Sequence, residues 1–152
     1  MRDVVSHLID VSLRRVAFHR DRHTPPPPPF PIGSDADFVR FINQINADWV
    51  SASKRLSTPQ LTALCAGAGR ELSDFLESVP FDAPGLFGVS WAGEMESPGW
   101  FDIGREFTEQ CHHQAQIREA AGAPPLADPA WLRATLEIFM RGLPHAYRAH
   151  AA

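Results

Sequence analysis

A carboxylate and an imidazole lie four residues apart in segment 100–122, and this pair could bind a metal ion. If the segment is one helix, Glu109 and His113 share a face, because four residues make about one helical turn. Side chains so placed can both reach one divalent cation. The alternative is an ordinary contact on a solvated helix surface. His112 points about a quarter-turn away and is a weaker candidate ligand.

The spacing and borders of segment 100–122 predict one helix. Trp100, Ile103 and Phe107 recur at helical spacing and form an apolar stripe. A Ser-Pro-Gly sequence precedes the segment as a start signal, and Gly122 ends it just before two prolines. The same helix would therefore carry the apolar stripe and the Glu/His pair.

Another histidine lies on an apolar helix face near the beginning of the chain. Segment 3–20 has a wide apolar face at helical spacing, and His7 falls inside that face. A histidine in this position is commonly a core residue with a hydrogen-bond partner. An inward-facing imidazole is also what a metal site in a helical bundle needs from a second helix. Both interpretations remain open at this point.

The rest of the chain adds further helices and two irregular segments. Residues 24–33 include five consecutive prolines and are predicted to form a polyproline II connector at the surface. Helices are predicted over 34–56 and 57–79, and a long loop over 80–99 could wall a pocket. A last helix is predicted over 128–143, before a proline that ends or kinks it.

Apolar side chains of the two middle helices are expected to form the core. They are Phe38, Phe41, Ile42, Ile45, Trp49 and Val50 in the first, and Leu61, Leu64, Cys65, Ala68, Leu72, Phe75 and Leu76 in the second. Val89 and Trp91 could form a short extended piece. Since no β-rich region or internal repeat occurs, we predict an all-α architecture in one domain, 1–152.

The totals exclude several classes of partner. A net charge of −4 provides no basic surface, so nucleic acid is not expected as a partner. No stretch is apolar and long enough to span a membrane. Two cysteines, Cys65 and Cys111, make no disulfide framework. Together these features favour a cytoplasmic protein with reduced thiols.

Three stretches resemble the DinB-like superfamily and, more narrowly, the mycothiol-dependent maleylpyruvate isomerase N-terminal family. They are Asp-Val-Val-Ser-His-Leu at 3–8, Val-Ser-Trp-Ala-Gly-Glu at 89–94 and Glu-Phe-Thr-Glu-Gln-Cys-His-His-Gln-Ala-Gln-Ile-Arg at 106–118. The similarity covers most of the chain and implies a metal-binding four-helix bundle. DinB-like proteins commonly carry two histidines four apart in the last stretch, whereas the isomerase branch has Glu and His.

Carried over residue by residue, the resemblance implies that His7, Glu109 and His113 are the metal ligands. The family fold has an additional long helix before the His-bearing one, and only six residues precede His7. We therefore expect a DinB-like bundle that lacks the family's first helix. A homodimer could cover the apolar surface left exposed.

The resemblance also implies a reaction. Two histidines and one glutamate are the ligands of several catalytic zinc sites, although nickel and iron(II) accept the same donors. In the family, mycothiol or a similar thiol binds the metal and adds as a thiolate to an electrophilic small molecule such as maleylpyruvate, giving isomerisation or thiol transfer. The alternatives are a metal-dependent hydrolase on the same bundle and a non-catalytic metal-binding or interaction protein.

Overall fold

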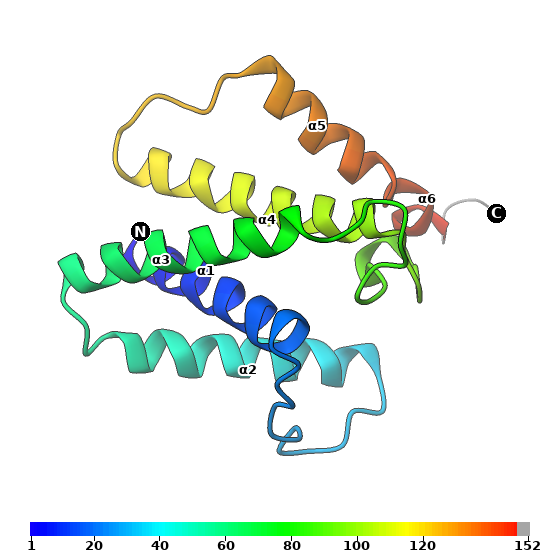
Figure 1. The fold of residues 1–152 in the computed structure, drawn as a ribbon, viewed down its shortest axis with the longest axis horizontal. Coiled ribbons are helices and arrows are strands. Elements are labelled where there is room, and N and C mark those ends of the chain that lie inside the picture. Colours follow the sequence, from blue (N-terminus) through cyan, green and yellow to red (C-terminus); the bar gives the residue numbers. More distant parts are fainter. Residues whose placement is uncertain (149–152) are drawn as a thin grey trace. The chain divides into compact units, whose positions relative to one another are not determined.

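The computed structural model describes residues 1–148, which form helices joined by irregular segments (Figure 1). In chain order the elements are α1 (Arg2–Arg15), the π-helix η1 (Val16–Arg20), α2 (Asp35–Ser53), α3 (Thr58–Glu77), the 3-10 helix η2 (Ser90–Ala92), α4 (Gly99–Ala120), α5 (Pro129–Met140) and α6 (Leu143–Ala146). Within this described range there is no β-strand, so the all-α prediction is confirmed. That the helices form a bundle of the DinB-like type stays a prediction.

The chain divides into two compact units, Met1–Phe75 and Leu76–Ala152. The first contains α1, α2 and nearly all of α3, and the second contains α4, α5 and α6. The prediction of a single domain over 1–152 stays a prediction.

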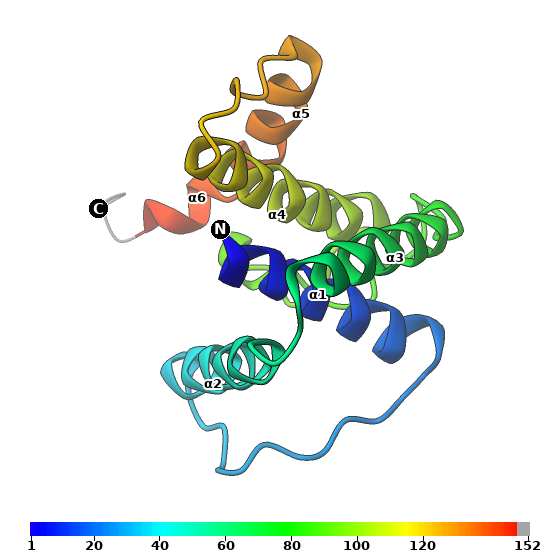
Figure 2. The same cartoon turned by 90° about the vertical axis from the view of Figure 1, so that its left-hand side faces the viewer.

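Hydrogen bonds join α1 to α2 in the first unit. The Ser6 hydroxyl donates to the Ser53 hydroxyl at 2.6 Å, and the Trp49 indole N–H donates to the Ser6 carbonyl at 2.9 Å. Further along, the Arg14 guanidinium donates to the Asn46 side chain at 2.7 Å. The connector between η1 and α2 runs outside the two helices that it joins (Figure 2). The three hydrogen bonds between α1 and α2 therefore fix the rotation of one helix against the other.

The core of the first unit is smaller than the apolar pattern predicts. Ile9, Leu61 and Ala68 form a buried cluster. Phe38 and Leu64 were expected in the core, but 45% and 43% of their surfaces are exposed. Phe38 lies in the first turn of α2, whereas the hydrogen bonds to α1 come from the second half of that helix. Leu64 lines an open apolar groove of 440 Å³.

The second unit is built on the contact between α4 and α5. Val89, Phe101 and Ile138 form its buried cluster, with Val89 and Phe101 fully inaccessible. Gly104 of α4 faces Ile138 so closely that an added β-carbon would lie 3.1 Å from the isoleucine Cδ1. The absence of a side chain at Gly104 therefore allows the two helices to approach.

Two local predictions in the second unit are wrong. The last long helix ends at Met140, and Pro144 lies in the first turn of the separate helix α6. Proline fits there because a first-turn residue needs no hydrogen-bonded N–H. Trp91 lies in η2, so the extended piece is limited to Val89, whose φ and ψ are −89° and 92°.

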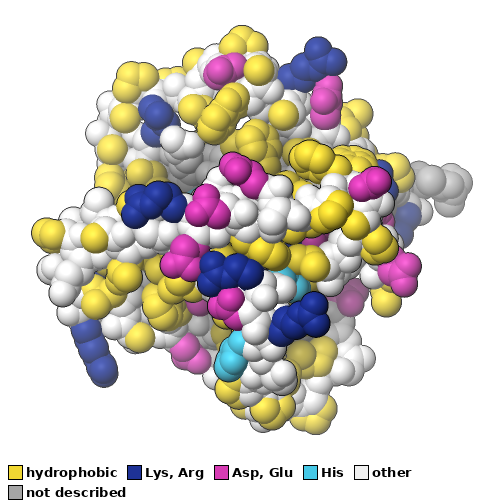
Figure 3. All heavy atoms as spheres, viewed as in Figure 1, with side chains coloured by type: hydrophobic (Ala, Val, Ile, Leu, Met, Phe, Trp, Pro, Cys, Tyr) yellow, Lys and Arg dark blue, Asp and Glu magenta, His cyan; other side chains and the backbone are white. Residues whose placement is uncertain are grey.

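One face of α5 is apolar and exposed. Leu132, Leu136 and Met140 follow one another at four-residue spacing. Between 54% and 61% of the surface of each residue is exposed. Hydrophobic side chains are correspondingly visible at the surface over this helix (Figure 3). Among the described residues, no helix combines the length and the apolar character needed to cross a membrane.

Candidate metal centre

The helix α4 holds the predicted carboxylate–imidazole pair. It runs as one unbroken helix over Gly99–Ala120, as the sequence predicts. Gly122 has a φ of +63° and ends the helix, and the N–H of Ala123 donates back to the Arg118 carbonyl at 2.9 Å. Because the pair lies well inside this helix, the backbone sets the separation of its two side chains.

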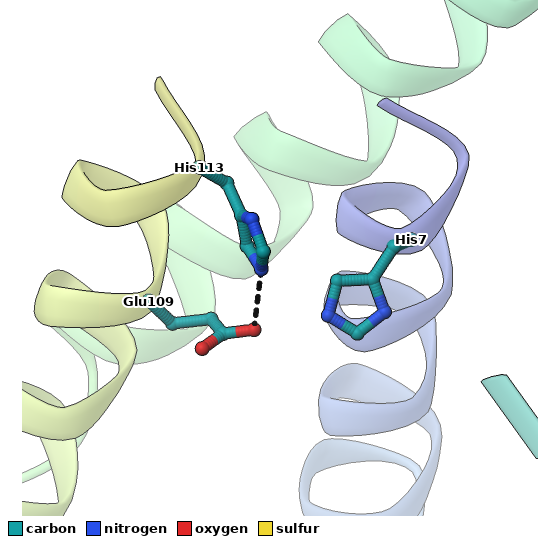
Figure 4. A group of neighbouring side chains, drawn as sticks. All are labelled: His7, Glu109 and His113. Carbon is teal, nitrogen blue, oxygen red and sulfur yellow. Dashed lines mark hydrogen bonds and ion pairs between the residues drawn. The ribbon is translucent and has the colours of Figure 1, made fainter. Parts of the chain in front are cut away.

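Glu109 and His113 are in direct contact. Oε1 of Glu109 lies 3.1 Å from Nε2 of His113, as the dashed line in Figure 4 marks. The histidine side chain is only 15% exposed and the glutamate side chain 34% exposed. The two groups thus form a partly buried pair, which agrees with either interpretation of their spacing.

The other ring nitrogen of His113 contacts an amide. Nδ1 lies 2.7 Å from Oε1 of Gln116. An amide oxygen can only accept, so this bond requires a proton on Nδ1. A neutral His113 ring then presents the bare lone pair of Nε2 to the Glu109 carboxylate, which is itself an acceptor. Two acceptors at 3.1 Å are stabilised by a cation between them, either a proton or a metal ion.

The spacing of these two atoms fits a zinc ion. Two ligands of a tetrahedral zinc ion, each at about 2.1 Å, lie about 3.4 Å apart. The observed distance of 3.1 Å between Oε1 of Glu109 and Nε2 of His113 is close to this value. The pair therefore suits a shared metal ion without a change of helix geometry.

His7 belongs to the first unit and extends from α1 (Figure 4). It is half-buried and follows Ser6, whose hydrogen bond to Ser53 fixes that turn of α1. An imidazole of this kind is a ligand type that, with Glu109 and His113, could hold a metal ion. The contact between Glu109 and His113 that their spacing predicts is therefore present. That these two residues and His7 bind a metal ion stays a prediction.

The buried carboxyl group of Asp10 follows His7 by one helical turn. Burial raises the pKa of Asp10, while the neighbouring Arg14 guanidinium and His7 partly oppose the shift. The Arg14 Nη2 atom lies 2.9 Å from the Asp10 carboxylate. The charged pair of Asp10 and Arg14 therefore lies on the same helix as His7, and the apolar pattern of that helix did not predict it.

Two cysteines and one arginine take part in structural contacts. Cys111 is 8% exposed, and burial raises the pKa of its thiol, partly offset by a hydrogen bond with Thr135. Cys65 packs against the core of the first unit. Arg118 donates to the Pro124 carbonyl at 3.1 Å, beyond the end of α4. None of the three was predicted as a ligand.

Sequence reasoning missed a pair of buried acids on α4. Asp102 and Glu106 are 0% and 1% exposed. The Leu86 N–H donates to Asp102 at 3.1 Å, and Arg105 pairs with Glu106 at 2.5 Å. The Arg105 guanidinium also lies 4.6 Å from the centre of the Phe87 ring. These contacts attach the 80–99 loop to α4, and only the four-residue spacing of the acids could have indicated them.

No family model matches the chain, and neither a curated protein nor a solved structure matches it. The resemblance to the DinB-like superfamily therefore stays a prediction from the sequence motifs.

Proposed function

We propose that this chain binds one divalent metal ion through His7, Glu109 and His113, and that zinc is the preferred ion. The observation that carries the proposal is the contact between Oε1 of Glu109 and Nε2 of His113 at 3.1 Å. The bond from Nδ1 of His113 to Gln116 adds support, because it leaves Nε2 as the ligand atom. Imidazole and carboxylate ligands suit zinc, and nickel and iron(II) accept the same set.

The reaction that we propose is thiol-dependent isomerisation or transfer on an electrophilic small molecule. Three protein ligands leave a fourth position for mycothiol or a similar thiol, and a bound zinc ion would lower the pKa of that thiol. Glu109 and His113 would orient this open position from α4, while His7 would close the ligand set from α1. The support for the reaction is the motif resemblance, which also favours a DinB-like bundle. Since Cys65 and Cys111 are free thiols, we place the protein in the reducing cytoplasm.

The first experiment measures bound metal per chain by elemental analysis after purification without added metal. We expect about one zinc ion in the parent. His7→Ala, Glu109→Gln and His113→Ala should each remove it, because the remaining two ligands hold zinc poorly. Circular dichroism would establish that each variant remains helical.

Matched control variants distinguish the loss of a metal ligand from an unspecific effect of replacing a histidine or a glutamate. His23→Ala removes an exposed histidine near the end of η1, and Glu119→Gln removes an exposed acid near the end of α4. Both should retain the metal. A folded parent without metal, or retention of metal by His113→Ala, would overturn the ligand assignment.

A second experiment tests the reaction class. The zinc-loaded parent would be incubated with a cis-configured, electron-poor alkene such as maleylpyruvate, with and without a low-molecular-weight thiol. We expect isomerisation or adduct formation only with thiol, and none in His113→Ala beyond the uncatalysed thiol reaction. Turnover that needs no thiol would contradict the proposed reaction and leave metal binding standing.

A further inference from the structure

A series of polar contacts continues along α4 beyond the proposed ligands. Nδ1 of His113 lies 2.7 Å from Oε1 of Gln116, and Nε2 of Gln116 lies 3.2 Å from Nε2 of His112. With Glu109, these residues are three or four positions apart on one helix, so they adjoin one another on its surface. All four residues of this series are carried by α4.

The donor and acceptor roles of Gln116, His112 and His113 depend on one another, because the two ends of the Gln116 amide contact different rings. The Gln116 NH2 group can only donate, so it requires a bare Nε2 on His112. With its nitrogen turned to His112, Gln116 directs its oxygen toward His113. That oxygen can only accept, so the proton of a neutral His113 ring resides on Nδ1. Nε2 of His113 is then the atom with an available lone pair, and it is the atom directed at Glu109.

We propose that Gln116 is a positioning residue for His113, and that His112 holds the Gln116 amide in the required orientation. The proposal rests on the proposed metal site, to which it adds two residues that do not bind the ion. Gln116 selects the ring tautomer in which Nε2 is the ligand atom, and it fixes the plane of the ring before the ion arrives. Partners of this kind typically change metal affinity by about 10- to 100-fold.

The effect expected here lies at the lower end of that range. Gln116 and His112 are both exposed, so water can replace either hydrogen bond in part. Removing the Gln116 amide should therefore weaken zinc binding about tenfold. Removing His112, which acts only through Gln116, should weaken it by less.

The test reads the His113 tautomer in the metal-free protein. Long-range nitrogen–proton NMR at a pH where the ring is neutral reports which nitrogen carries the proton. The parent should show the proton on Nδ1. Gln116→Leu, which removes the acceptor at similar size, should give a mixture of tautomers, whereas Gln116→Glu keeps an acceptor and should restore the parent state. Gln114→Leu on the same helix is the matched control and should change nothing.

Zinc affinity is measured in parallel by competition with a chromogenic chelator. Gln116→Leu should bind about tenfold more weakly than the parent and Gln114→Leu equally well. A parent with the proton on Nε2 of His113, or an unchanged tautomer in Gln116→Leu, would overturn the inference. A parent that binds no zinc but shows the Gln116-dependent tautomer would overturn the proposed function, and it would leave standing only the control of the His113 tautomer by Gln116.

Discussion

Glu94 and Arg141, 47 positions apart in the sequence, form a salt bridge at 2.6 Å. The Ser97 hydroxyl donates to the second oxygen of the same carboxylate, also at 2.6 Å. The Arg141 guanidinium lies 4.6 Å from the centre of the Phe101 ring. Glu94 therefore links the 80–99 loop to Arg141, the residue that follows α5. The guanidinium of Arg141 in turn contacts Phe101 in the first turn of α4.

We predict that Glu94→Gln lowers the free energy of unfolding by about 1 kcal/mol at pH 7, a modest value because 37% of the Arg141 side chain is exposed. The hydrogen bond from Arg141, and then that from Ser97, hold the pKa of Glu94 below its usual range. Because the folded pKa is the lower one, the stabilisation is complete above the unfolded value, about 4.3, and is lost as the pH falls through the folded value. The difference between parent and variant should therefore shrink below about pH 4. Urea unfolding followed by tryptophan fluorescence measures it.

The matched control is Glu96→Gln, two positions along the same loop. Glu96 is exposed, so its replacement should change the stability by less than about 0.5 kcal/mol at any pH. An equal pH dependence in both variants would show that general acid effects, and not the bond to Arg141, cause the loss.

A side chain at Gly93 is expected to lower the stability of the protein. Its φ is +75°, and an added β-carbon would lie 2.1 Å from Nδ1 of His145. Gly93→Ala should therefore cost about 1 kcal/mol for the left-handed backbone and about 1 kcal/mol or more for displacing the imidazole. Gly122→Ala is the control, because Gly122 has a φ of +63° and open space around it. Thermal unfolding of the two variants measures the difference.

A double variant isolates the contact between Gly93 and His145. In a His145→Ala background, Gly93→Ala should cost no more than Gly122→Ala does in the parent, because only the backbone conformation remains unfavourable. Equal losses for the two glycine variants in the parent would mean that the His145 ring moves aside freely.

The helix borders could be predicted from the sequence because their signals are local. Ser34 caps α2 by accepting a hydrogen bond from the Asp37 N–H at 3.2 Å, and Asp128 caps α5 through the Ala130 N–H at 2.8 Å. Each cap and its partner are two or three residues apart. Residue types alone therefore indicate where these helices begin.

Long-range contacts and rotamers could not be predicted in the same way. The exposure of Phe38 depends on which part of α2 packs against α1, which its helical spacing does not encode. At the candidate site, the four-residue spacing indicated Glu109 and His113, and the structure brings them together. The role of Gln116 depends on the rotamers of neighbouring side chains, so residue types and spacing do not predict it.

The buried bond between Ser6 and Ser53 is predicted to stabilise the contact of α1 with α2. Ser53 donates its own proton to the Val50 carbonyl at 2.8 Å, so it accepts from Ser6. Ser53→Ala leaves the Ser6 hydroxyl without this acceptor at a site with no solvent access. We expect a loss of about 1–2 kcal/mol in the free energy of unfolding. Chemical denaturation of the purified variants measures it.

A double-mutant cycle compares Ser53→Ala with Ser6→Ala and with the variant that carries both replacements. Together the two replacements should cost less than the sum of the single ones, because no hydroxyl is left unsatisfied. Ser51→Ala, at an exposed position of α2, corrects for the higher helix propensity of alanine. Strict additivity would show that the hydrogen bond makes no net contribution.

Cys65 is predicted to react slowly with thiol reagents in the folded protein. It packs against the buried cluster of Ile9, Leu61 and Ala68. Burial raises the pKa of its thiol, so less of the reactive thiolate is present at pH 8. In a Cys111→Ser background at pH 8, we expect Cys65 to react at least about tenfold more slowly than in urea. Ala66→Cys in a Cys65→Ala, Cys111→Ser background places a thiol at the next, exposed position of α3 and should react at nearly the unfolded rate. Equal rates at the two positions in folded protein would contradict the partial burial of Cys65, because both thiols are carried by the same helix and differ in the face on which they lie.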